Sequence, residues 1–60
     1  MGSQLLDIQE AAEYLTVSRA TVYRAVKRGR LRMVKVEGLT RFRLAELERY
    51  LRANERHTAA

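Results

Sequence analysis

The sequence predicts a small, mainly helical domain that contains one β-hairpin. In three segments, apolar residues recur every three to four positions, a spacing that gathers them on one side of a helix. Between the second and third of these segments, over residues 33–43, the spacing changes to every second residue, as in a strand. The predicted order of elements is therefore helix, helix, hairpin, helix.

The first helix is expected to begin at Asp7. Asp7 and Glu10 have the spacing of a capping box, in which the first carboxylate accepts a backbone N–H and the second reaches back to the start. The apolar stripe that follows has helical spacing and consists of Ile8, Ala11, Ala12 and Leu15.

A second helix is expected after a short break at Thr16 and Val17, with Ser18 as its capping residue. Gly29 stands where a helix ends with a residue at positive φ. The core-facing stripe consists of Val22, Ala25 and Val26. The outward positions are Arg19, Ala20, Thr21, Tyr23, Arg24, Lys27 and Arg28.

The hairpin turn is expected near residues 37–39, because Gly38 supplies the backbone freedom that a tight reversal needs. Val34 and Val36 share one face of the first strand, and Phe42 alternates with Arg41 and Arg43 in the second. A third helix through about residue 52 is then predicted by the spacing of Leu44, Leu47, Tyr50 and Leu51.

The charge of the chain is unevenly distributed. Residues 17–43 hold nine of the twelve Lys and Arg but only one of the seven acids, Glu37, and carry a charge of +8. The rest of the chain sums to −3, so the net charge of +5 conceals one strongly positive side. Such a side favours a polyanionic partner such as double-stranded DNA.

The length and composition exclude several classes of protein. Sixty residues make one domain, 1–60, with little core for a substrate pocket, so no enzymatic activity and no catalytic residue are expected. The chain has no Cys and a single His, His57, so neither a metal site nor another cofactor is expected. No apolar run is long enough to cross a membrane, and we expect a cytoplasmic protein with flexible ends at residues 1–4 and 54–60.

Two helices joined by a tight turn, the second of them basic, match the helix-turn-helix plan, in which the second helix enters the major groove of DNA. The basic hairpin would then be a wing that contacts phosphates or directs its tip, residues 38–40, toward a minor groove. The predicted wing residues are Lys35, Gly38, Leu39, Thr40, Arg41 and Arg43.

Residues 5–51 also resemble the excisionase-type, or MerR-like, winged helix-turn-helix family. The motifs that carry the resemblance are Tyr14-Leu15, Val17-Ser18, Gly29-Arg30-Leu31 and Tyr50-Leu51. Where this family often has Gly, the chain has Thr16, and where it often has Pro, the chain has Arg32 and Arg43.

The resemblance implies that Thr21 and Arg24, with the neighbouring Ala20, read bases, and Arg is well shaped for the O6 and N7 of guanine. Other residues at the start and along the face of the helix are expected to bind phosphates: Ser18, Arg19, Tyr23, Lys27 and Arg28. The alternative to DNA binding is that these residues form an ordinary solvated helix face. By resemblance, the C-terminal residues Arg49, Arg52 and Arg56 are candidate contacts to a partner protein.

The sequence is compatible with three functions. The leading hypothesis is an excisionase, phage- or plasmid-borne, that binds and bends DNA, associates with further copies on it, and assists a cognate integrase in excision. The alternative is a small MerR-like transcriptional regulator; the short chain favours the excisionase. A third class is a protein-interaction module whose basic face meets an acidic protein.

Overall fold

The structure, a computed structural model, describes residues 4–55. In chain order its elements are β1 (Leu5–Leu6), α1 (Ile8–Leu15), α2 (Arg19–Lys27), β2 (Val34–Val36), β3 (Leu39–Arg43) and α3 (Leu44–Asn54). The predicted fold class, mainly helical with a small hairpin, is confirmed. The expectation of flexible ends falls largely on residues 1–3 and 56–60, outside the described residues.

The predicted start of α1 is confirmed by both halves of the capping box. The N–H of Glu10 donates to Asp7 Oδ1 at 2.8 Å, and the N–H of Asp7 donates to Glu10 Oε1 at 2.9 Å. Two otherwise orphaned backbone donors are thereby satisfied at the first turn. This cap is why an eight-residue helix begins sharply after Asp7.

The sheet has one strand more than the sequence predicted. β1 pairs antiparallel with β3, so that Leu5 is opposite Arg43 and Leu6 is opposite Phe42, and the strand order is β1-β3-β2. Two residues are too few to show an alternating pattern, so the sequence does not predict this strand. The residue before β1 also caps the start of α3. The carbonyl of Gln4 accepts the N–H of Leu44 at 2.9 Å, a backbone donor that has no partner within the helix.

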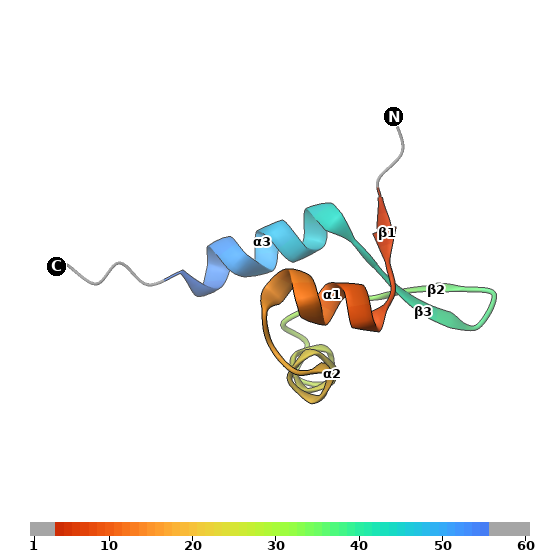
Figure 1. Cartoon of the computed structure of the whole chain (residues 1–60), viewed down its shortest axis with the longest axis horizontal. Helices are drawn as coiled ribbons and strands as arrows, with labels where there is room; N and C mark the ends of the chain where they lie inside the picture. Colours follow the sequence, from red (N-terminus) through yellow and green to blue (C-terminus); the bar gives the residue numbers. More distant parts are fainter. Residues whose placement is uncertain (1–3, 56–60) are drawn as a thin grey trace, which may run out of the picture.

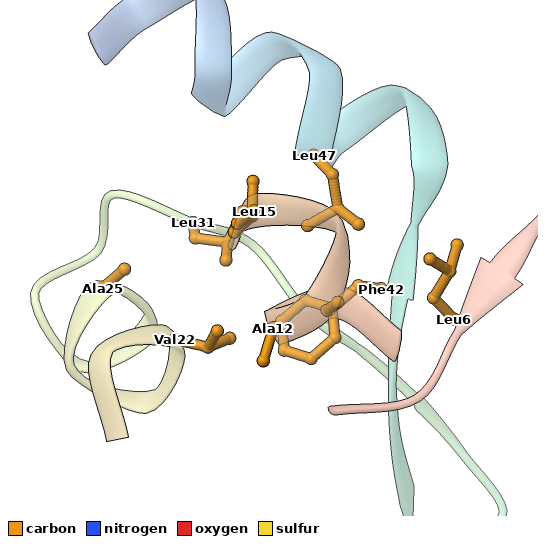
Figure 2. Close-up of a cluster of buried hydrophobic side chains, with 9 residues drawn as sticks. Leu6, Ala12, Leu15, Val22, Ala25, Leu31, Phe42 and Leu47 are labelled. Carbon is orange, nitrogen blue, oxygen red and sulfur yellow. The ribbon is translucent and has the colours of Figure 1, made fainter. Parts of the chain in front are cut away.

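The core gathers one or more side chains from β1, the three helices, β3 and the loop between α2 and β2. Phe42 and Leu47 are fully buried, and Val22 and Leu31 are each 1% exposed. Figure 2 shows the ring of Phe42 among the labelled side chains of β1, α1 and α3. The proximal end of the hairpin is therefore part of the core, while its far end is not.

The packing of the helices leaves α2 accessible. α1 contacts both α2 and α3, and in Figure 1 it lies between them. The same view looks almost along the axis of α2, with the hairpin of β2 and β3 extending to one side and the second half of α3 to the other. One side of α2 is thus turned away from the rest of the protein.

Candidate nucleic-acid interface

The turn between α1 and α2 comprises residues 16–18. Thr16 adopts the left-handed conformation, with φ 56° and ψ 43°, and the N–H of Val17 donates to the carbonyl of Ala12 at 3.0 Å. The N–H of Thr16 also donates to the carbonyl of Glu13 at 3.1 Å, and the two bonds form a Schellman motif, which usually has glycine where this chain has Thr16. The chain can therefore reverse within three residues and begin α2 at a defined angle to α1.

Ser18 caps α2 as predicted. Its Oγ accepts the N–H of Thr21 at 3.2 Å and lies 3.0 Å from the Thr21 hydroxyl. Both hydroxyl groups are thus engaged with each other at the first turn of α2. The predicted roles of Ser18 at a phosphate and of Thr21 at a base remain predictions, but each hydroxyl already has one intramolecular partner.

The exposed side of α2 follows from the helical repeat of about 100° per residue. With Val22 and Ala25 buried, Ala20, Arg24 and Lys27 form the line that faces away from the core. Arg19 and Tyr23 flank this line on one side, and Thr21 and Arg28 flank it on the other. Of these seven side chains only Thr21 is partly buried, and α2 contains no acidic residue.

The C-terminal end of α2 is also a Schellman motif. Gly29 has φ 75°, its N–H donates to Val26, and the N–H of Arg30 donates to Ala25 at 2.9 Å. The predicted role of Gly29 as a helix terminator is confirmed. Leu31 then enters the core, which leaves its neighbours Arg30 and Arg32 exposed.

Arg30 and Arg32 are not among the site residues that the sequence predicts, although both belong to the basic segment 17–43. Their common feature is that they flank a residue that is only 1% exposed. The alternation of charged and apolar residues at 30–32 indicates that the two arginines are exposed. Only the fold shows that the loop carrying them lies beside α3.

The turn of the wing, residues 34–43, lies within the predicted 37–39, but the tip is not at residues 38–40 as predicted. Glu37 and Gly38 both have positive φ, 51° and 81°, and form a two-residue turn. Leu39 and Thr40, which were placed at the tip, belong to β3 and pair with Val36 and Lys35. The pairing of these two strands leaves only Glu37 and Gly38 between them.

The three cations of the wing are divided between its two faces. Residues directly opposite each other in an antiparallel pair point to the same face, so Lys35 shares a face with Thr40 and donates to its Oγ1 at 3.0 Å. Arg41 and Arg43 lie on the other face because side chains alternate along β3. Lys35 is therefore on the opposite face of the wing from Arg41 and Arg43, and its predicted contact with phosphate stays a prediction.

The predicted partner residues at the C-terminus differ in their surroundings. Arg49 is bound to Glu46 within α3 and also donates to the backbone carbonyl of Arg30 at 2.9 Å. Arg52 is exposed in the last turn of α3, whereas Arg56 lies outside the described residues. Arg49 thus has an intramolecular function that the sequence did not indicate.

Residues 4–55 contain no group of three or more His, Cys, Asp or Glu that could hold a metal ion, and His57 lies beyond this range. None of the helices within the same residues has the length and apolar character to span a bilayer.

Comparison with known proteins places the chain in a family. A family model described as a helix-turn-helix domain matches residues 5–55, a range that includes every helix and strand described above. Neither the comparison with curated proteins nor that with solved structures found a significant match. Helix-turn-helix domains bind double-stranded DNA in a sequence-specific way, with the second helix in the major groove. With its short turn, its exposed basic second helix and this match, the chain belongs to the helix-turn-helix domain family of DNA-binding proteins.

Proposed function

We propose that the chain recognises a specific DNA site by inserting α2 into the major groove. The observation that carries this proposal is the outward line of α2, where Ala20, Arg24 and Lys27 are exposed on a helix without acids. An α-helix with its side chains is about 10 to 12 Å in diameter, which fits the major-groove width of about 12 Å.

Within this line we assign the reading of bases to Arg24 and Ala20. The guanidinium of Arg24 can donate two hydrogen bonds to a guanine, and the small Ala20 allows the helix to approach a thymine methyl group. Thr21 would read at the edge of the same site, since it is partly buried and paired with Ser18. Phosphate contacts that set the register are assigned to Ser18, Arg19, Tyr23, Lys27 and Arg28.

The wing supplies a second contact in this proposal. Arg41 and Arg43 share a face and would neutralise phosphates beside the major groove. The turn at Glu37 and Gly38 would lie nearest the adjacent minor groove. Lys35, on the opposite face, would contribute through the long-range positive field rather than through the same phosphates.

For the biological role, we propose an excisionase that bends its site, associates with further copies on DNA and assists a cognate integrase. The support is the resemblance of residues 5–51 to the excisionase-type family. Arg52 and Arg56 are the proposed integrase contacts. We leave out Arg49, because its guanidinium already binds Glu46 and the loop after α2. A small MerR-like regulator is the second candidate, since the same motifs occur there.

DNA binding is tested by measuring affinity for genomic fragments as a function of salt, together with footprinting. If five to eight cations neutralise phosphates, log affinity should fall against log salt with a slope of about −5 to −7. A slope shallower than about −2, or the absence of any sequence-dependent footprint, would contradict the proposed interface.

The biological role is tested in a reconstituted recombination reaction with the cognate integrase. The full chain should stimulate excision and should either inhibit integration or fail to support it. It should also bend its DNA site, which is measured as a reduced mobility of the complex in a gel. Unchanged recombination in both directions, with altered transcription from a neighbouring promoter, would identify the regulator instead.

A further inference from the structure

A basic groove runs beside α2 on the side of α3. It consists of two adjoining hollows that share Arg30. The first lies between α2 and Tyr50 of α3 and is lined by Arg24 and Arg28. The second lies between the loop after α2 and the second half of α3, where Arg32 and Arg30 line it. The groove therefore continues from the base-reading face of α2.

The charge of the second hollow is positive in spite of the acid that lines it. Both carboxylate oxygens of Glu46 bind Arg49, at 3.0 Å to Nε and 2.6 Å to Nη2. Glu46 also accepts the backbone N–H of Arg32 at 3.0 Å. Among residues 4–55 the only ion pair is that of Glu46 with Arg49. The exposed guanidinium groups of Arg30 and Arg32 thus form no ion pair within the described structure, although the charge of Arg32 contributes to lowering the pKa of Glu46.

The backbone around these two arginines is held in place by three contacts. The N–H of Arg30 donates to Ala25, its carbonyl accepts from Arg49, and the N–H of Arg32 donates to Glu46. Leu31 between them is in the core. Two cations on a fixed backbone lose less conformational freedom on binding an anion than two cations on a mobile loop.

We propose that Arg30 and Arg32 bind the phosphate backbone of the DNA strand that borders α2 on the side opposite the wing. This inference rests on the proposed insertion of α2 into the major groove. In Figure 1 the wing and the second half of α3 lie on opposite sides of α2, so a duplex docked on α2 would be held at both borders of its major groove.

DNA suits this groove better than an acidic segment of a partner protein. The groove is continuous with Arg24 and Arg28 of the proposed interface. Its second hollow has Ala53 as its largest apolar lining residue. The aromatic residue of the groove, Tyr50, lines the first hollow beside Arg24 and Arg28, whereas the second hollow has no apolar or aromatic anchor of the kind that dominates protein interfaces.

The test compares Arg30→Gln and Arg32→Gln with Arg52→Gln. Each variant removes one positive charge, but Arg52 does not line the groove. Arg52 is proposed to contact integrase and has no assigned DNA contact, and integrase is absent from this DNA-binding assay. Because Arg30 and Arg32 stabilise the loop through backbone atoms, the substitutions should leave the circular dichroism spectrum unchanged. We expect each of the two groove variants to reduce the magnitude of the salt slope by about one unit, and Arg52→Gln to leave it unchanged.

A second readout locates the contact on DNA. Neutral methylphosphonates are placed one at a time along the duplex, and the positions that weaken binding of the unaltered protein are recorded. Positions at the border of the footprint away from the wing should lose their effect in Arg30→Gln and Arg32→Gln. Retention of every sensitive position in both variants, with an unchanged salt slope, would overturn the inference.

Arg24→Ala separates this inference from the proposed function. If Arg24→Ala weakens specific binding while the groove variants bind DNA normally, the inference fails and the function stands. If none of the three matters, both fail. If Arg30→Gln and Arg32→Gln lose binding to a short polyglutamate peptide but keep normal DNA binding, the groove binds an acidic protein segment instead. This result would also overturn the inference.

Discussion

Arg49 and Glu46, one turn apart on α3, together hold the backbone that connects α2 to β2. Nη2 of Arg49 is 2.6 Å from Oε2 of Glu46 and also donates to the carbonyl of Arg30 at 2.9 Å. Glu46 accepts the N–H of Arg32 at 3.0 Å. Because the residue between these two backbone groups, Leu31, is in the core, the loop is fixed from both sides.

Glu46→Ala should destabilise the domain by about 1 to 2 kcal/mol at neutral pH, because charge-assisted hydrogen bonds are lost. The hydrogen bond from Arg49 is the main cause that holds the pKa of Glu46 below its usual 4.5. A lowered pKa means that this stabilisation is present above about pH 4.5 and is lost as the pH falls through the folded-state pKa. Urea denaturation should therefore show the variant's deficit at pH 7, and the deficit should shrink as the pH falls through the folded-state pKa of Glu46.

The matched control for this experiment is Glu48→Ala, an exposed acid on the same helix. It should cost much less than Glu46→Ala at neutral pH. Equal losses for the two variants would mean that Glu46 does not hold the loop.

Thr16→Gly should stabilise the domain. A side chain with a Cβ in the left-handed region costs about 1 to 2 kcal/mol, and Gly avoids this cost but adds freedom to the unfolded chain. We expect a net gain of up to about 1 kcal/mol, or about 4 to 8 °C in Tm. Thr16→Ala keeps the strained φ of 56° and loses the hydroxyl bond to the Leu15 carbonyl, so it should lower the Tm. A lower Tm for both variants would contradict this account.

Glu37→Asn should improve the wing in two ways. Glu37 has φ 51° in a two-residue turn, a position that Asn tolerates better, so stability should rise by up to about 1 kcal/mol. The change also removes a negative charge at the tip and should tighten DNA binding at low salt. Glu37→Gln separates the effects, because it removes the charge without favouring the turn. If neither variant changes DNA affinity, the tip does not approach DNA.

Arg24→Ala and Lys27→Ala should differ in which DNA they weaken. Loss of a two-bond contact to a base should cost Arg24→Ala about 1 to 3 kcal/mol on the best site and much less on random DNA. Lys27→Ala should weaken both kinds of DNA alike and lower the salt slope by about one unit. Titrations of the two variants against both duplexes decide this, and equal losses for Arg24→Ala on the two would exclude base reading.

The starts of α1 and α2 and the end of α2 could be predicted because each depends on contacts within a few residues. The capping box of Asp7 and Glu10, the cap at Ser18 and the positive φ of Gly29 are local interactions, so the order of residue types determines them. The basic character of α2 and its buried stripe follow in the same way from the helical repeat.

Tertiary structure decided the features that join segments far apart in the sequence. β1 exists because Leu5 and Leu6 pair with β3, and Arg49 is structural because it reaches a loop 19 residues away. Arg30 and Arg32 become one end of a groove only where α3 passes beside them. Such contacts depend on how the elements pack around Phe42 and Leu31, and no local pattern of residues contains that information, because packing is a property of the whole core.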